Sequence, residues 1–219
     1  AIDSERIPSR GRQPILSLEG GKSTRIVLCA HLDTAPETPG AVDNGAGAAV
    51  LLGVAELLAR ERPEVSVDLV PFNGEEYYAV PGQLAYLERR KPNRENTHLA
   101  INLDACGFNG SRNAFSFYGD FCGDSSAADA SLRMRIDAHI ARDPLALWGP
   151  EWVEGDHSIF AGLGIPAAAL TSSTLREEVV PLTHTTLDTL DHLDFTLLDS
   201  AAKLLFEIIC GEALYTLQK

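Results

Sequence analysis

The sequence has few cysteines and no cysteine pair at metal-binding spacing. Its four cysteines, Cys29, Cys106, Cys122 and Cys210, are scattered without C-x-x-C motifs, which argues against a disulfide-dense scaffold and a cysteine-type zinc site. Cys29 and Cys106 stand in apolar runs, where cysteine usually behaves as a small hydrophobic side chain. This distribution favours a reducing compartment, so we expect a cytoplasmic protein. Secretion with a signal removed before residue 1 is the alternative.

Basic residues are also scarce. Lysine and arginine total 18 against 31 aspartates and glutamates, which gives a formal net charge of −13. Nucleic-acid binding needs a basic face that releases counterions from phosphates, so we expect no DNA or RNA partner. No apolar run reaches the roughly 18–20 residues of a membrane span, and we expect no membrane partner. The acidic charge suits cationic or metal partners, and simple solubility explains it equally well.

What is present is a chain of 219 residues with 45% hydrophobic residues. That length and composition allow a sizeable core and suit one large α/β domain. The sequence has no internal repeats, no low-complexity tract and no linker rich in Pro, Gly or Ser. We therefore interpret residues 1–219 as a single domain.

Strands and helices alternate along the chain. Apolar runs predict strands at 25–33, 65–74, 98–107, 114–119 and 164–172. Helical patterns cover 45–63, 80–91, 125–142 and 195–218. The alternation predicts right-handed crossovers and a mostly parallel sheet flanked by helices on both faces. In such sheets ligands bind beyond the carboxyl ends of the strands.

Polar side chains gather at the ends of these strands. His31 and Asp33 end the first one, and two residues of spacing predicts that both lie on one face of the strand. A carboxylate beside an imidazole fixes the tautomer of the ring. Asp43, Asn44 and Gly45 follow before the first long helix. Alone, the first pair indicates a structural or capping role and the second motif a turn or helix cap.

Two further strands lead into carboxylates. Glu75 and Glu76 follow the second strand, and Asp104 stands in the apolar run INLDACG. A buried carboxylate carries a large desolvation penalty unless it is paired or bound to metal. His184 lies in a loop before the last helix, with Asp188 four residues later.

Together these segments supply two imidazoles, three carboxylates for metal, and a spare carboxylate. Mixed histidine and carboxylate ligation suits Zn²⁺. Five ligands are more than one zinc ion needs, and they divide well over two ions if one aspartate bridges them. Two ions about 3.5–4 Å apart are the arrangement of two-metal hydrolysis.

The order of these motifs resembles one protein family. CAHLDTAPETPGAVDNGAGAAVLL, FNGEE, NLDACG, GDHSIF and HTTLDT occur in the order expected of the M28 metallopeptidases. From about residue 25 to 217 the chain is similar to the compact aminopeptidases of that family. The resemblance implies an α/β phosphorylase/hydrolase-like fold with a mixed sheet, two zinc ions at its carboxyl edge, and a peptide or amino-acyl substrate.

The resemblance also implies roles for single residues. His31 and Asp104 match the ligands of one zinc, Glu76 and His184 match those of the other, and Asp43 matches the bridging carboxylate. The supporting or pocket-lining positions are Asp33, counted with the catalytic group, and Asp188, Asn44, Asp156 and His157.

The expected reaction is removal of the amino-terminal residue of a peptide. Glu75 matches the general base, which takes a proton from metal-bound water and delivers it to the leaving amine. In many relatives a tyrosine precedes the late histidine and helps to stabilise the oxyanion. Thr183 stands there instead, which puts that aid in doubt.

Other functions stay open at this stage. A glutaminyl-cyclase-like acyltransferase with one zinc would use Asp43, Glu76 and His184, although retention of His31 and Asp104 favours two metals. A non-catalytic metal- or peptide-binding relative is a further alternative, as is carboxypeptidase or amidohydrolase specificity. Trp148 and Trp152 are more typical of packing than of a pocket wall. The preferred side chain and the oligomeric state are open.

Overall fold

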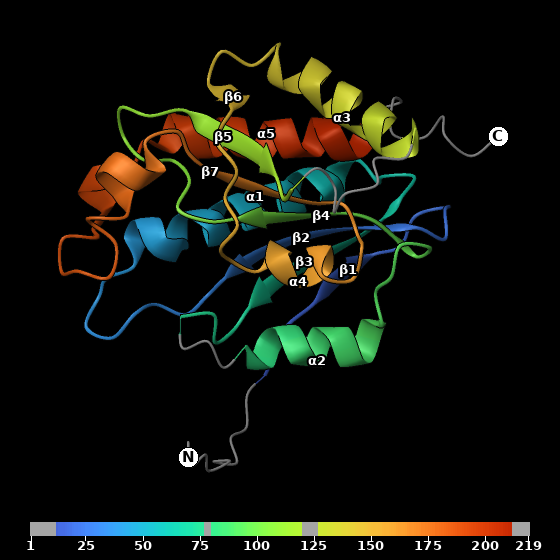
Figure 1. Cartoon of the computed structure of the whole chain (residues 1–219), viewed down its shortest axis with the longest axis horizontal. Helices are drawn as coiled ribbons and strands as arrows, with labels where there is room; N and C mark the ends of the chain where they lie inside the picture. The colour runs from blue at the N-terminus through green and yellow to red at the C-terminus, as the bar shows by residue number, and fades with distance from the viewer. Residues whose placement is uncertain (1–11, 77–79, 120–126, 212–219) are drawn as a thin grey trace.

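Short apolar segments pair into one mixed sheet in the computed structural model, which describes residues 12–76, 80–119 and 127–211 (Figure 1). The strand order is β1-β3-β2-β4-β7-β5-β6. The strands are β1 (Leu16–Leu18), β2 (Arg25–His31), β3 (Ser66–Phe72), β4 (Thr97–Leu103), β5 (Asn113–Phe117), β6 (Ala146–Trp148) and β7 (Ala167–Ser172). Parallel pairing joins β3, β2, β4 and β7, and also β5 and β6. The pairs β1–β3 and β5–β7 are antiparallel.

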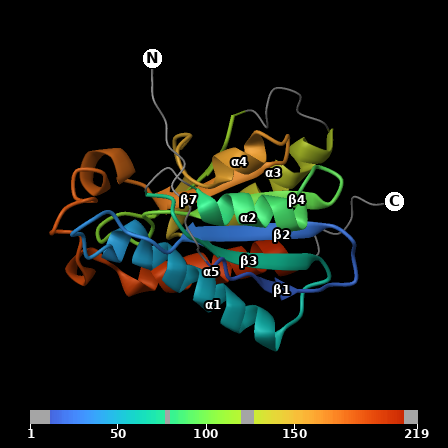
Figure 2. The same cartoon turned by 90° about the horizontal axis from the view of Figure 1, so that it is seen from below.

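Helices cover both faces of this sheet (Figure 2). They are α1 (Ala46–Arg60), α2 (Pro81–Arg90), α3 (Ala127–Ile140), α4 (His157–Ala161) and α5 (Phe195–Cys210). Three shorter helical turns are η1 (Ala41–Gly45), η2 (Leu175–Val179) and η3 (Leu190–His192). Helices α1 and α5 pack together on one face, α2 and α4 lie on the other, and α3 packs against α5 and β6. The predicted α/β fold with a mostly parallel sheet flanked on both faces is confirmed.

The central strand β2 is buried on both of its faces. Ile26 and Leu28 belong to the core under α1 and α5, whereas Val27 and Cys29 belong to the core under α2 and α4. Side chains alternate along a strand, so a strand between two layers of helices has to be apolar at every position. This explains the unbroken apolar run in the sequence.

A buried carboxylate on β3 anchors α2 to the sheet. Asp68 is fully buried and accepts hydrogen bonds from the Ser17 hydroxyl at 2.7 Å and the Tyr86 hydroxyl at 2.9 Å. The guanidinium groups of Arg25 and Arg90 complete its partners, at 2.6 Å and 3.0 Å. Because Tyr86 and Arg90 belong to α2, this network fixes the helix that follows the Glu75–Glu76 loop.

Several predicted boundaries were wrong. Strand β2 ends at His31, so Asp33 lies in the following loop and not on the same strand face. Strand β4 ends at Leu103, so Asp104 directly follows the strand. Helix α5 ends at Cys210, and residues 212–218 of the predicted helix lie outside the described residues. Elements β1, β6 and α4 were missed because segments of three to five residues carry no clear periodicity.

By length and composition alone, the helical segment Ala41–Arg60 is long and apolar enough to cross a membrane, which differs from the expectation that no segment would be. Half of its most apolar window is buried inside the fold, where α1 packs against α5 and β2. A core helix passes the same test, so the segment is only weak evidence of a membrane span.

Candidate metal centre

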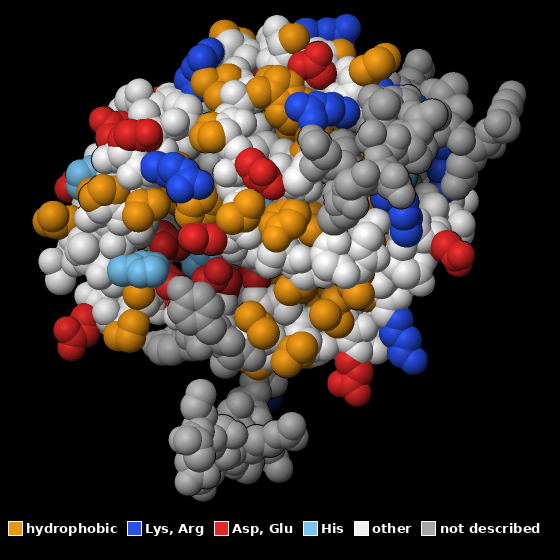
Figure 3. Space-filling view, viewed as in Figure 1, with side chains coloured by type: hydrophobic (Ala, Val, Ile, Leu, Met, Phe, Trp, Pro, Cys, Tyr) orange, Lys and Arg blue, Asp and Glu red, His pale blue; other side chains and the backbone are white. Residues whose placement is uncertain are grey.

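The predicted metal ligands meet at the carboxyl ends of three neighbouring strands. His31 is the last residue of β2, Asp104 directly follows β4, and Glu76 lies in the loop after β3. Since β3, β2 and β4 are adjacent and parallel, their ends share one edge of the sheet. These residues line a cavity of about 510 Å³. Figure 3 shows acidic and histidine side chains in this hollow, with hydrophobic side chains around it.

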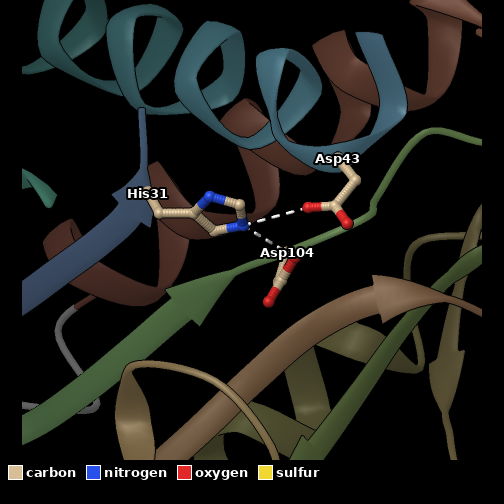
Figure 4. Close-up of side chains that lie close together, drawn as sticks. All are labelled: His31, Asp43 and Asp104. Carbon is tan, nitrogen blue, oxygen red and sulfur yellow. Dashed lines mark ion pairs between the residues drawn. The ribbon is translucent and has the colours of Figure 1, made fainter. Parts of the chain in front are cut away.

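Asp43 occupies the centre of the site. Its Oδ1 lies 3.0 Å from Nε2 of His31, and its Oδ2 lies 3.2 Å from Nε2 of His184. Each carboxylate oxygen therefore faces a different imidazole, which is the arrangement that a carboxylate bridging two metal ions requires. Figure 4 shows the His31 ring directed between the carboxylates of Asp43 and Asp104.

Two groups of potential ligands share Asp43. His31 and Asp104 complete the first group, with Nε2 and Oδ1 separated by 3.5 Å. Glu76 and His184 complete the second group, with Oε2 and Nε2 separated by 2.9 Å. Within each group the candidate ligand atoms all lie within 4.8 Å of one another. The structure thus brings together all five predicted metal ligands.

The hydrogen bonding of His31 fits a metal ion at Nε2. Its Nδ1 lies 3.0 Å from the backbone oxygen of Asp33 and donates its proton there. The opposite nitrogen, Nε2, then faces the carboxylates of Asp43 and Asp104, an arrangement that needs a positive charge between them. Burial lowers the pKa of His31, but the two carboxylates outweigh it and raise the pKa to about 12.

The surroundings of Asp43 also indicate a bound cation. Its Oδ1 is buried and has no hydrogen-bond partner among the described residues, despite its distance of 3.0 Å from His31. An unbonded buried carboxylate oxygen carries a desolvation penalty that a cation offsets. Imidazole nitrogens and carboxylate oxygens are ligands that Zn²⁺ accepts, so the residues present fit zinc.

Glu75 lines the same cavity and is not part of either ligand group. Burial, with the nearby Asp104 carboxylate, raises the pKa of Glu75 to about 8. A carboxyl group with a pKa near neutrality can accept a proton and return it within one catalytic cycle. Glu75 is therefore a candidate general base.

The Asp33 carboxylate holds the loop that carries both glutamates. Its Oδ1 accepts hydrogen bonds from the backbone N–H groups of Gly74 at 2.8 Å and Glu75 at 3.2 Å, and its Oδ2 accepts from that of Glu76 at 3.1 Å. Its own backbone oxygen orients His31. Asp33 thus supports the site through hydrogen bonds and does not line the cavity.

Asp188 and Asn44 support the site from the other side. The Asp188 carboxylate is fully buried and accepts hydrogen bonds from the backbone N–H groups of Val42 at 2.6 Å and Asp43 at 3.1 Å. The Asn44 amide donates to the backbone oxygen of Leu103 at 2.8 Å and accepts from Gly47 at 3.0 Å. Asn44 therefore ties the Asp43 loop to the end of β4, next to Asp104.

The predicted dipeptide Asp156-His157 divides between two roles. Asp156 lines the cavity, accepts a hydrogen bond from the side-chain amide of Gln83, and has its pKa raised by burial to about 7. His157 is fully buried and is not among the lining residues. Its Nε2 lies 2.7 Å from the backbone oxygen of Trp152.

Some lining residues were missed by the sequence reasoning. Trp152 lines the cavity, whereas Trp148 packs edge-on against Phe115, so the assignment to packing was correct for Trp148 and missed the place of Trp152 in the cavity lining. The single signal for Trp152 was its place in the loop that leads to Asp156. Gln83 had no signal, because a polar residue on a helix is usually exposed. Thr183 lines the cavity too, and its hydroxyl donates to the backbone oxygen of Val180 at 3.2 Å.

This chain is similar to known proteins in sequence and in fold. Aminopeptidase YwaD of Bacillus subtilis (strain 168) is 27% identical over 181 residues, which cover 82% of this chain and 39% of YwaD. The solved structure of BSAP, a zinc aminopeptidase from Bacillus subtilis, is 25% identical with a TM-score of 0.70. That match covers 89% of this chain and 48% of BSAP. The chain thus spans less than half the length of these relatives.

A third similarity concerns the fold alone. A glutaminyl cyclase from Bacteroides thetaiotaomicron is 22% identical with a TM-score of 0.70, over 90% of this chain and 76% of the cyclase. The model of peptidase family M28 matches residues 15–209, which include every predicted site residue. The chain belongs to peptidase family M28.

Proposed function

We propose that the chain is a zinc-dependent exopeptidase that hydrolyses the amino-terminal peptide bond of its substrate. The observation that carries this proposal is the pair of ligand groups that share Asp43, with Glu75 beside them in one cavity. The names of the similar proteins support it, since YwaD and BSAP are both described as aminopeptidases and BSAP as a zinc enzyme.

Each residue has a distinct task in this reaction. His31 and Asp104 would hold one zinc ion, Glu76 and His184 the other, and Asp43 both. Zinc bound there would lower the pKa of water toward about 7 and polarise the scissile carbonyl. Glu75 takes the proton from the attacking water and returns it to the leaving amine.

The charge of the cavity favours the amino end of a peptide. Its described lining includes the carboxylates of Glu154 and Asp156 besides Glu75 and the metal ligands, but no lysine or arginine. A substrate carboxylate would therefore lack a cationic side-chain partner there, whereas an α-ammonium group would be attracted. This distribution supports an aminopeptidase over a carboxypeptidase or an amidohydrolase that binds a free carboxylate.

A glutaminyl-cyclase-like acyltransferase is the second candidate, because a glutaminyl cyclase shares the fold. Such an enzyme with one zinc would need only Asp43, Glu76 and His184. The placement of His31 and Asp104 against the same bridging carboxylate supports a second ion and hence the peptidase.

Zinc content and hydrolysis, measured together, test the proposal. The chain is purified without chelator, zinc is counted by mass spectrometry, and amino-acid release is followed with a panel of aminoacyl anilides. We expect about two zinc ions per chain, as a two-metal site requires. In Glu75→Gln, kcat should fall by about 10²–10⁴ while zinc stays bound. The exposed Glu56→Gln variant is the control and should match the wild type.

The opposite results are equally informative. About one zinc ion without anilide hydrolysis would favour the acyltransferase. A folded, metal-free protein would contradict both candidate functions. Bound zinc without turnover across the whole panel would point to a non-catalytic binding protein.

A further inference from the structure

His157 closes the loop that forms one wall of the cavity. It is the first residue of α4 and is fully buried, and its Nε2 lies 2.7 Å from the backbone oxygen of Trp152. Because a carbonyl oxygen only accepts, Nε2 must carry the proton of this hydrogen bond. Burial lowers the pKa of His157. The Tyr118 ring packs edge-on against it at 5.6 Å.

The loop held in this way carries several lining side chains. Trp152, Glu154, Gly155 and Asp156 all line the cavity, whereas His157 stands behind them. Within the described part of the chain, no other hydrogen bond to the Trp152 carbonyl is present. The path of the loop therefore depends on the His157 side chain at the point where Trp152 enters the wall.

The Trp152 ring makes two further contacts. The Arg176 guanidinium lies 5.6 Å from the ring centroid, and the ring packs against a small apolar cluster that includes Leu175 and Ala105. Leu175, Ala105 and Val180 also line the cavity. Ala105, Leu175 and Trp152 therefore form an apolar part of the cavity lining, and Ala105 directly follows the candidate ligand Asp104.

We propose that His157 is a positioning residue that fixes Trp152 as the apolar wall against which the side chain of the substrate's first residue packs. The inference rests on the proposed function for the identity of the substrate. It assigns no chemical step to His157, which acts only through the Trp152 backbone. Loss of the His157 hydrogen bond should weaken binding of large apolar side chains and leave the metal centre intact.

Steady-state kinetics separate this role from a general structural one. His157→Leu keeps an apolar side chain of moderate size without a donor, whereas His157→Gln can place an amide N–H near the position of Nε2. In His157→Leu we expect KM for a leucyl anilide to rise about tenfold, equivalent to about 1.4 kcal/mol. We expect kcat, zinc content and KM for a glycyl anilide to stay close to wild type. His157→Gln should restore most of the leucyl KM.

Fluorescence gives a readout that does not depend on turnover. The chain has two tryptophans, so Trp148→Phe leaves Trp152 as the only one. In that background, free L-leucine should quench Trp152 emission. The added His157→Leu substitution should weaken the quenching, and His157→Gln should retain it. Circular dichroism of each variant checks that the fold persists.

The two hypotheses fail in different ways. Unchanged leucyl KM and unchanged quenching in folded His157→Leu would overturn the role of His157. If His157→Leu lost bound zinc and had a lower kcat while KM for the leucyl anilide was unchanged, the role would also be overturned, because His157 would then act through the metal centre. Leucine-dependent quenching that follows the expected variant order without anilide hydrolysis would support the wall and contradict the proposed peptidase activity.

Discussion

The Oδ2 atom of Asp33 accepts a hydrogen bond from the backbone N–H of Glu76 over 3.1 Å, which joins the loop after β2 to the loop after β3. Oδ1 of the same carboxylate binds Gly74 and Glu75. One side chain therefore holds the backbone of both the proposed base and a proposed zinc ligand. The site depends on this contact, although the Asp33 side chain does not line the cavity and belongs to neither ligand group.

Replacing Asp33 with Ala should weaken both stability and activity. Three backbone N–H groups would lose a charged acceptor, and hydrogen bonds to charged groups contribute about 1.5–3 kcal/mol each when buried. Because the site is partly open to water, we expect a total loss of about 2–4 kcal/mol in the free energy of unfolding. We also expect kcat to fall about 100-fold or more, as misplacement near the reacting atoms does.

Urea unfolding of the metal-free protein and kinetics of the zinc-loaded protein measure the two effects. Asp33→Asn keeps one acceptor oxygen and should fall between the wild type and Asp33→Ala. The exposed Asp199→Ala variant is the control and should change stability by less than about 0.5 kcal/mol. Equal behaviour of Asp33→Ala and Asp199→Ala would contradict the role given to Asp33.

Gly155→Ala should disturb the ligand group of His31 and Asp104. A Cβ at this position would lie 2.9 Å from Nδ2 of Asn102 and 3.2 Å from Oδ2 of Asp104, and the backbone φ is +99°. A side chain is strained in this conformation at a cost of about 1–3 kcal/mol. We expect zinc titration to show weaker binding of one ion while the other is retained.

Gly162→Ala is the matched control in the same segment. Its φ is −60°, and the nearest atoms to an added Cβ lie at 3.5 Å, an ordinary contact distance. This variant should bind both ions as the wild type does. Full retention of both ions by Gly155→Ala would show that Asp104 can shift without loss of binding.

Asp156 should make the metal-free protein less stable as pH rises. Its pKa is about 7 in the folded state and about 3.9 in the unfolded chain, so the folded protein binds this proton more tightly. The stabilisation is fully present below about pH 4 and is lost as pH rises through about 7.

Asp156→Asn removes this titration. Between about pH 5 and 7 the wild type should lose up to about 1.4 kcal/mol per pH unit relative to the variant, which corresponds to one proton. Urea unfolding at several pH values, with chelator present, gives the difference. Parallel stability curves for the two proteins would exclude Asp156 as the titrating group.

Removal of zinc should lower the melting temperature. A ligand at 100 times its Kd stabilises the folded state by about 2.7 kcal/mol, and 1 kcal/mol corresponds to about 2–4 °C for a chain of this size. We therefore expect chelation to lower Tm by about 5–10 °C for each saturated ion. Differential scanning calorimetry with and without chelator measures the change.

His184→Ala should abolish about half of this zinc effect. The variant lacks one member of the second ligand group but keeps His31, Asp43 and Asp104. The His184 side chain is 56% exposed, so the metal-free variant should be nearly as stable as the metal-free wild type. His139→Ala, outside both ligand groups, is the control. Two tightly bound ions in His184→Ala would contradict the ligand assignment.

Much of the fold was predictable because long apolar elements carry strong patterns. The apolar run of β2 and the helix α1 were found within a few residues of their observed ends. Strands β1 and β6 were not, since three residues have no period, and these strands form by pairing with the distant strands β3 and β5. The resemblance had pointed to Asp188 as a supporting residue, but its backbone partners Val42 and Asp43 were hidden, and so was the role of Gln83, because these partners are distant in sequence.

The sequence by itself determined which residues are candidate metal ligands. The types and order of the strand-end residues already predicted a metal site shared by His31, Asp43, Glu76, Asp104 and His184. Only the tertiary structure decided which hydrogen bonds support the loops of that site and which residues line its cavity. Asp33 turned out to bind the glutamate loop, and His157 to bind the Trp152 backbone behind the cavity. Ligand chemistry depends on residue type, whereas support depends on which distant backbone groups packing brings within hydrogen-bonding distance.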